Sequence, residues 1–520
     1  MKPLKRLKKT PKFEGRGKES DAPMFHPDHP RPVSRRQFLG QGFITGAATI
    51  AAPSMLSMLG AREAAAQASC ALTGAGAGLV PFIAIDLGGG ANIAGSNVSI
   101  GGPGGQEDPL SEEGYERLGL PLDMTPLNGA IDSYDRTMNL RFHFDSALMR
   151  GILDRADPVL TLPNVEGVIV PSRSSNDTQN NPLNPMYGIA RYGADGGLLR
   201  LIGSRNSESG GRSMAPASLI VPEWRPTKID RPDDVTGLVD TGKLPLLLGT
   251  DGAGQVADAI QALSALKVEQ INEDAAVKDL VNCAYQQSND LITLFGSPDA
   301  LDPRLDSIIY DPDPANPTDA IFFGDDFNES EFRKTASVMK LVCEGHAGAG
   351  TIEMGGYDYH GGTRSRGELK DFTAGQCIGA ILEYARRNPL VGDVMIYLFT
   401  DGSLSSDGQI DNSADGRGKG AWQSDNSNTA CGVFLVYRQS AKPDLVPAFA
   451  TTRQIGHFRT SGTVETGANP VANNPEALAQ LAILNYMALH GSTAGDFNTL
   501  FPGNALGTEA ANLVAFTQIR

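Results

Sequence analysis

The sequence predicts an α/β protein with a doubly wound, mostly parallel sheet and helices on both of its faces. Short apolar runs alternate with amphipathic stretches of helical length, most clearly in the last third of the chain. The most apolar run, Val394–Phe399, ends in Thr400-Asp401-Gly402, which is typical of a buried strand that feeds a turn. The stretch from Asn474 to His490 has Pro475 near its start and Gly491 just past its end, as helices do. Strands that alternate with helices favour a parallel sheet covered on both sides.

Strands are expected where a short apolar run ends in turn-forming residues. The first run, Phe82–Leu87, ends in Gly88-Gly89-Gly90 and is followed by a Gly-rich loop over residues 95–108. The expected strands are 82–87, 165–170, 198–202, 218–221, 349–354, 394–399 and 432–437. In a sheet of this kind, a binding site lies beyond the carboxyl ends of the strands.

Helices are expected where apolar residues recur on one face. Leu148 and Ile152, for example, share a face of the stretch Phe144–Ala156. The expected helices are 144–156, two between 256 and 295, 332–343, 367–386 and 474–490. Residues 297–327 are rich in Pro and Asp, which predicts a surface loop, and the whole segment 225–330 is interpreted as a helical and loop insertion or cap.

The N-terminus carries the pattern of a twin-arginine export signal. Ser34-Arg35-Arg36-Gln37-Phe38-Leu39 is followed by a mildly apolar stretch over 43–59, which falls short of the ~20 apolar residues of a membrane span. Ala66-Gln67-Ala68 then offers a small-x-small cleavage site. The sequence therefore predicts a signal peptide over 1–68, export by the twin-arginine translocase, and a mature domain over 69–520 that is periplasmic or secreted.

The charge of the chain excludes some partners. The whole chain has a formal charge of −16, the first 68 residues carry +7, and residues 69–520 are left with −23. So strong a negative charge argues against nucleic acid and anionic membrane surfaces as binding partners, because both bind proteins through Lys and Arg. No segment after residue 68 resembles a transmembrane span.

The cysteines suit an oxidising compartment but do not define their pairing. They are Cys70, Cys283, Cys343, Cys377 and Cys431, and none forms a C-x-x-C motif. Disulfides 283–343 or 377–431 are possible after export, and buried free thiols are the alternative. Lipid attachment at Cys70 is disfavoured because Gln67 stands where such a signal has Leu.

The most specific polar motif is Gly355-Gly356-Tyr357-Asp358-Tyr359-His360, directly after the expected strand 349–354. A carboxylate and an imidazole two residues apart suit a divalent metal such as zinc. The alternative is a turn in which Asp358 caps the following structure and His360 is merely exposed.

Other polar groups also follow expected strands. Asp401 comes after the strand 394–399, where it is either a cation ligand or part of a plain Asp-Gly turn. Asn92 follows the first strand and offers an amide oxygen. Arg173-Ser174-Ser175 places hydroxyls beside a guanidinium group, as a nucleophile next to an anion clamp requires, although a hydrophilic loop has the same composition. Further ligand candidates, each with a structural alternative, are Asp415, His457 and His346.

In order and spacing, these groups resemble the twin-arginine-exported family known as domain of unknown function 1501, of the alkaline phosphatase and sulfatase-like superfamily. Its Gly-Gly-Ala-Asp is similar to Gly89–Asn92, its Arg-Ser-His to Arg173–Ser175, and its Gly-Gly-aromatic-Asp-Thr-His to Gly355–His360. A strand ending in Thr-Glu-Phe-Gly-Arg is similar to Phe399–Ser403, and Gly-x-Asp-His-Gly to Ala414–Gly418. The resemblance covers most of residues 80–495.

The resemblance implies an alkaline-phosphatase-like hydrolase of phosphate or sulfate esters. In that superfamily a Ser or Thr alkoxide attacks a small anionic ester at a binuclear metal centre. The residues it implies here are Asp358 and His360 for one metal, Asp401 and Asn92 for a second, and Ser174 or Ser175 as the nucleophile beside Arg173. Zinc or manganese is expected rather than calcium.

The same comparison supports an alternative without turnover. Asn92 replaces the family's Asp, Ser175 stands where the family has His, and Asp415 has no adjacent His. Each change removes a charge or an imidazole that a two-metal site would use. The alternative is therefore a periplasmic or surface binding or assembly protein that kept the fold and holds one metal or none. A redox protein has only the export route in its favour.

Overall fold

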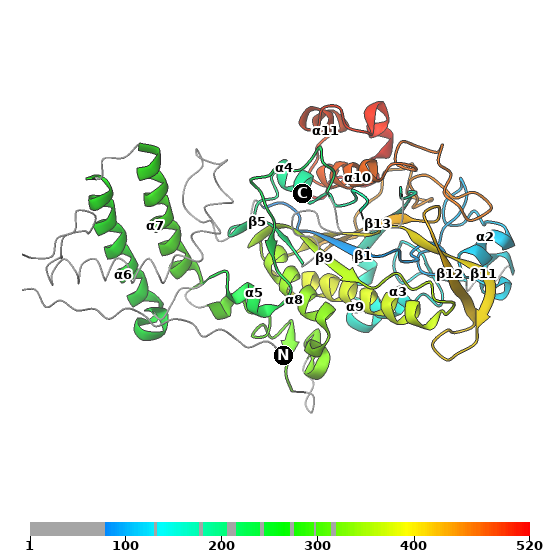
Figure 1. Ribbon diagram of the computed structural model, residues 1–520, viewed down its shortest axis with the longest axis horizontal. Coiled ribbons are helices and arrows are strands. Elements are labelled where there is room, and N and C mark those ends of the chain that lie inside the picture. The colour runs from blue at the N-terminus through cyan, green and yellow to red at the C-terminus, as the bar shows by residue number, and fades with distance from the viewer. Residues whose placement is uncertain are drawn as a thin grey trace, which may run out of the picture. The chain divides into compact units, whose positions relative to one another are not determined.

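The computed structural model describes residues 78–520, except 129–132, 176–179, 205–214, 240–243, 271–274, 296–297 and 314–318 (Figure 1). The predicted signal peptide, residues 1–68, lies outside the described residues, as does Cys70. Within the described part of the chain, no helix has both the length and the hydropathy that a membrane span requires.

A seven-stranded sheet forms the centre of the described chain, in the order β4-β13-β10-β1-β9-β5-β6. Neighbouring strands are parallel, except that β13 runs antiparallel to both β10 and β4. The strands are β1 (Phe82–Gly88), β4 (Val165–Pro171), β5 (Leu199–Gly203), β6 (Thr227–Lys228), β9 (Ala347–Gly355), β10 (Asp393–Thr400) and β13 (Cys431–Arg438). The predicted α/β class with a mostly parallel sheet is confirmed.

Both faces of the sheet are buried. In β1, Ile83 and Ile85 contribute to one core while Phe82 and Ala84 contribute to the other, because successive side chains of a strand point to opposite faces. The first face packs against α3 (Ala147–Arg155), α8 (Ser330–Cys343) and α9 (Ser365–Arg387), and the second against α4 (Met186–Tyr192) and α10 (Pro475–Ala488) (Figure 1). Near-continuous apolar strands are what such double coverage requires.

Further helices and strands lie outside this sheet. Among the described residues, the remaining α-helices are α2 (Glu112–Arg117), α5 (Pro232–Thr236), α6 (Leu244–Val268), α7 (Ala275–Phe295) and α11 (Ala494–Leu500). The remaining strands form the pairs β2 (Tyr134–Asp135) with β3 (Phe142–His143), β7 (Tyr310–Asp311) with β8 (Phe322–Phe323), and β11 (Ser403–Asp411) with β12 (Lys419–Asn426). The pair β11 and β12 is a long hairpin that was not expected from the sequence.

Helices α3 and α9 touch through their backbones. A Cβ atom on Gly375 would lie 2.0 Å from the carbonyl oxygen of Leu148, and one on Gly151 would lie 2.1 Å from the carbonyl oxygen of Phe372, so no larger residue fits at either place. Helix α3 begins at Ala147, later than predicted, because the Ser146 hydroxyl caps it by accepting a hydrogen bond from the Met149 amide.

The loops that follow four strands meet at one edge of the sheet. Gly88 at the end of β1 is in register with Gly355 at the end of β9, and Leu87 is in register with Thr400 at the end of β10. β4 ends at the same edge, because β13 is antiparallel to both β4 and β10. The convergence of these loops, which the sequence predicted, follows from this register.

Two element predictions are wrong. Residues 218–221 form no strand, because Pro222 follows them and lacks the N–H that a ladder needs. Residues 217–219 instead form a turn, in which Leu219 donates its amide to the Pro216 carbonyl. The segment 297–327 is more than a surface loop, since Ile309 and Phe322 are fully buried in the core. Their burial outweighs the Pro and Asp content from which the loop was predicted.

The segment 225–330 contains the two helices that were predicted between 256 and 295. They are α6 and α7, which pack against each other, and α6 starts earlier than predicted. The same segment also contains α5, which packs against α8. Its interpretation as an insertion or cap stays a prediction.

Neither of the two possible disulfides, 283–343 or 377–431, forms, and the alternative of buried free thiols holds for three of the cysteines. Cys283 is disulfide-bonded, whereas Cys343, Cys377 and Cys431 are free and buried. Cys377 lies between α8 and α9, where its Sγ is 3.8 Å from the Glu331 carbonyl oxygen, while Cys431 begins β13 opposite Pro171. The fold thus assigns Cys377 and Cys431 to different layers.

Candidate metal centre

The segment after β9 alternates buried tyrosines with exposed polar residues. Tyr357 and Tyr359 are each 1% exposed, whereas Asp358 and His360 reach the surface. This alternation is that of an extended chain with one face on the protein. The Tyr357 amide donates to the Gly88 carbonyl at 3.2 Å, which ties the segment to the end of β1. The two predicted ligands therefore point the same way, outwards from the carboxyl edge of the sheet.

Tyr359 anchors the turn between the two candidate ligands. Its hydroxyl donates to Asp371 Oδ1 at 2.8 Å and accepts a hydrogen bond from the Asn92 amide at 3.2 Å. Asp371 belongs to α9 and Asn92 to the loop after β1, so one phenol joins two elements. The backbone on either side of Tyr359, which carries Asp358 and His360, is thereby fixed.

A third ligand candidate, Asp425, comes from β12. This strand lies beside the segment because the Gly362 amide donates to the Trp422 carbonyl at 2.9 Å. His360 Nε2 is 2.7 Å from Asp358 Oδ1 and 3.5 Å from Asp425 Oδ1, and one ligand atom from each of the three residues lies within 4.8 Å of the others. Two carboxylates and an imidazole at this spacing could hold a divalent cation and leave further coordination positions open.

Asp401 and Asn92 direct their side chains into the protein. Asp401 is 2% exposed, and its Oδ1 accepts hydrogen bonds from the amide and the side chain of Asn181. Asn92 is fully buried, and its Oδ1 accepts a hydrogen bond from the Ser96 hydroxyl at 2.6 Å. Both lie at the expected edge, but Asp401 does not belong to the group of Asp358, His360 and Asp425, and the Asn92 amide oxygen is engaged by Ser96. Their roles as ligands of a second metal stay predictions.

The predicted nucleophiles lie in the loop after β4. Ser174 is buried, and within the described residues its hydroxyl has no hydrogen-bond partner. Ser175 is exposed, and its amide donates to Asn181 Oδ1 at 2.9 Å, so Asn181 links this loop to Asp401. The Arg173 amide donates to the Ala472 carbonyl at 2.8 Å. These contacts place the loop at the carboxyl edge, and none of the contacts found among the described residues sets a base beside either hydroxyl.

The remaining ligand candidates lie apart from Asp358 and His360. Asp415 is exposed in the loop between β11 and β12, and the carbonyl of His457 accepts a hydrogen bond from the Glu465 amide. His346 is 3.1 Å from Glu344 and packs against Phe295. None of the three belongs to the candidate centre.

Asp425 was missed because its neighbourhood carries no strand signal. It lies within the polar run Gln423-Ser-Asp-Asn-Ser-Asn428, which reads as a loop before β13. Only the pairing of β12 with β11, and its contact with Gly362, brings Asp425 to His360. The preceding residues 419–422 are all buried and include Lys419 and Gly420, so they show neither an alternating pattern nor an apolar run that would have revealed the strand.

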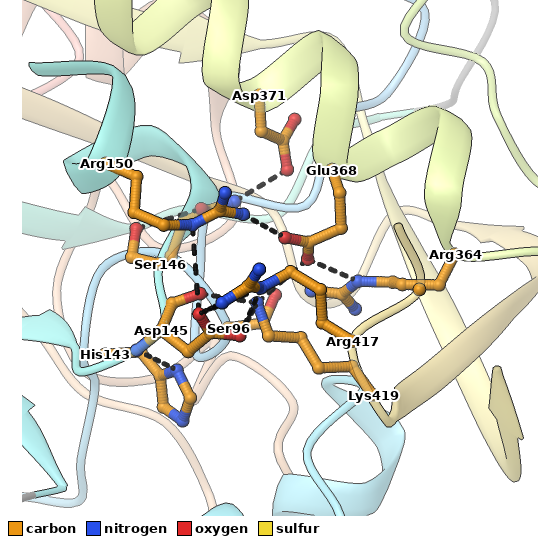
Figure 2. A network of polar contacts seen from close by, with 12 residues as sticks. Ser96, His143, Asp145, Ser146, Arg150, Arg364, Glu368, Asp371, Arg417 and Lys419 are labelled. Atoms are coloured by element: carbon orange, nitrogen blue, oxygen red, sulfur yellow. Dashed lines mark hydrogen bonds and ion pairs between the residues drawn. The ribbon is translucent and has the colours of Figure 1, made fainter. Parts of the chain in front are cut away.

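A buried ion network lies at the start of α9 and is shown in Figure 2. Glu368 Oε1 accepts hydrogen bonds from Arg364 Nε and Lys419 Nζ, both at 2.9 Å, and Glu368 Oε2 accepts one from Arg150 Nη2 at 2.8 Å. Asp145 accepts hydrogen bonds from Arg417. Arg364 and Lys419 have at most 1% of their side chains exposed. The network joins α3, α9 and β12.

The network shifts the pKa of its members. Burial alone would raise the pKa of Glu368, but Arg364 and Lys419 outweigh it and lower the pKa below its usual value. Burial, reinforced by Arg364, lowers the pKa of Lys419. Burial and the nearby charge of Lys419 lower the pKa of His143 to about 4, so this histidine is neutral at physiological pH.

Comparison of the sequence with models of known protein families, and with curated proteins, gave no match.

Proposed function

We propose that this protein binds one divalent cation through Asp358, His360 and Asp425 and thereby engages phosphate or sulfate esters, on an alkaline-phosphatase-like fold. The observation that carries the proposal is the convergence of these three side chains, from two segments far apart in sequence, within 4.8 Å at the carboxyl edge of the sheet. Ligand sites of open α/β sheets lie at this edge.

The three residues would contribute different properties to a cation site. Asp358 and Asp425 bring two negative charges, which a divalent cation neutralises. His360 stands between them and binds a cation as a neutral imidazole. A bound zinc or manganese ion would act as a Lewis acid toward an ester oxygen. The surface position of all three side chains leaves room for a substrate on the solvent side.

A second candidate function, binding without turnover, has its own support. Asp401 and Asn92 already accept hydrogen bonds from Asn181 and Ser96, and the Ser174 hydroxyl is buried. A two-metal hydrolase would need these groups free to reach a substrate and a second ion. On this hypothesis the cation recruits an anionic partner, and the protein serves in binding or assembly.

Metal binding tests the site. We expect the exported protein to bind about one equivalent of Zn²⁺ or Mn²⁺ in equilibrium dialysis, and Asp425→Asn to weaken binding by more than the roughly 10–100-fold that loss of a ligand's hydrogen-bond partner costs. Asp407→Asn, on exposed β11 of the same hairpin, is the matched control and should bind as the parent does. Equal affinity of the Asp425 and Asp407 variants would refute the site.

Turnover separates the two functions. Hydrolysis of an aryl phosphate or aryl sulfate that is lost in Asp425→Asn supports the hydrolase. Metal binding without turnover of either ester supports the binding protein.

A further inference from the structure

A cavity of about 190 Å³ opens above the buried ion network, on the side of α9 that faces α3. Arg150 and Arg417 line it, together with Leu369, Phe372 and Asp415. The two arginines are about a third exposed, whereas the Glu368 side chain beneath them is 3% exposed. The cavity thus has a charged floor, two guanidinium groups and an apolar wall.

The two guanidinium groups are held next to each other. Arg150 Nε is 3.8 Å from Asp145 Oδ1, and Arg417 Nη2 is 2.5 Å from the same oxygen (Figure 2). Arg150 Nε is buried and has no hydrogen-bond partner within the described residues. The two like charges repel each other, and Asp145 and Glu368 offset this repulsion only in part, because both carboxylates also pair with Lys419.

Cations outnumber carboxylates in this network. Four cations, Arg150, Arg364, Arg417 and Lys419, form their ion pairs with two carboxylates, Asp145 and Glu368. Exposed Asp415 at the rim makes no ion pair within the described residues and reduces the excess to one positive charge. Among the groups that form these ion pairs, together with Asp415, one further negative charge would give balance, which favours a monoanion over a dianion.

The backbone at Arg417 is strained in a way that supports this use. Its φ of 59° lies in the left-handed region, which costs a residue with a side chain roughly 1–2 kcal/mol. The following Gly418 also has a positive φ, of 73°, at no such cost, whereas Arg417 carries a side chain, which the loop sets over Asp145. Strain that aims a charged group into a cavity is a feature of binding sites.

The geometry points to a binding site for a small organic carboxylate between Arg150 and Arg417. The carboxylate would pair with the guanidinium groups, which match it in shape, and its apolar body would lie against Leu369 and Phe372. Neither arginine belongs to the candidate metal centre. This site is therefore separate from the proposed cation site and holds whether or not that site binds metal.

The test uses benzoate as the probe, in a ligand-observed NMR titration of the exported protein. We expect saturable binding of benzoate, weaker binding of phenyl phosphate, and none of neutral benzamide. Leu369→Glu, which adds a negative charge at the exposed rim, should weaken benzoate binding by about tenfold or more. Leu390→Glu is the matched control, because Leu390 is also an exposed leucine but lies in the loop before β10.

A second variant removes a binding group directly, whereas Leu369→Glu acts only through an added charge at the rim. Arg150→Gln should also weaken benzoate binding about tenfold, since a hydrogen bond to a charged group is worth ~1.5–3 kcal/mol. Benzoate that does not saturate, or that binds the Leu369 and Leu390 variants equally, would overturn the proposal. Tighter binding of phenyl phosphate than of benzoate would overturn the assignment to a monoanion.

Discussion

Replacing Glu368 by glutamine is expected to lower the free energy of unfolding by about 3–5 kcal/mol, the cost of breaking a buried charge cluster by removing one partner. Glu368 is the carboxylate on which Arg150, Arg364 and Lys419 converge. Its side chain is 3% exposed, so water cannot take its place. Without it, Arg150, Arg417 and Lys419 would share Asp145, and Arg364 would lose the carboxylate with which it pairs.

Urea unfolding of the parent and variant measures this cost. The matched control is Glu465→Gln, which breaks the ion pair with Arg459 at the surface, where solvent screens the charges, so it should change stability little. If Glu368→Gln destabilises the protein no more than Glu465→Gln does, the network contributes no more than a surface pair, and Lys419 must find another partner.

The central sheet could be predicted because its strands are short apolar runs that end in turn residues. Phe82–Leu87 and Val394–Phe399 are buried on both faces, so their apolar composition alone predicts that they are central strands of the sheet. Residues 218–221 have the same composition but lie between two prolines, and local chemistry overrides the apolar pattern there. The hairpin of β11 and β12 is polar along much of its length, so the apolar pattern gave no sign of it.

The candidate centre was predictable only in the part that is local in sequence. Asp358 and His360 stand two residues apart after a strand, so their common direction follows from the extended chain. Asp425 reaches them through strand pairing, and Asp145 reaches Arg417 through the contact of α3 with α9 and the β11–β12 loop. Such partners depend on long-range packing, which residue spacing does not encode.

Asp371 is expected to make the stability of the protein fall as pH rises from about 4 to 7. The carboxyl is fully buried, and burial raises its pKa to about 7, although hydrogen bonds from Tyr359 and Asn97 oppose the shift. In the unfolded chain its pKa is the ordinary value of about 3.9. Between these two values the folded state holds a proton that the unfolded state has lost, so stability decreases with pH across this window.

Asp371→Asn removes this titration. As the pH rises from 4 to 7, the free energy of unfolding of the variant should increase relative to that of the parent by up to about 4 kcal/mol. This follows from a shift of about three pKa units at ~1.36 kcal/mol each. Loss of the hydrogen-bond geometry to Asn97 shifts the variant's plot of unfolding free energy against pH by a constant, so the difference in slope between variant and parent remains. Urea unfolding at several pH values measures that slope, with Asp407→Asn as an exposed control. Curves for the parent and Asp371→Asn that stay parallel from pH 4 to 7 would mean that the Tyr359 and Asn97 hydrogen bonds keep Asp371 ionised despite its burial.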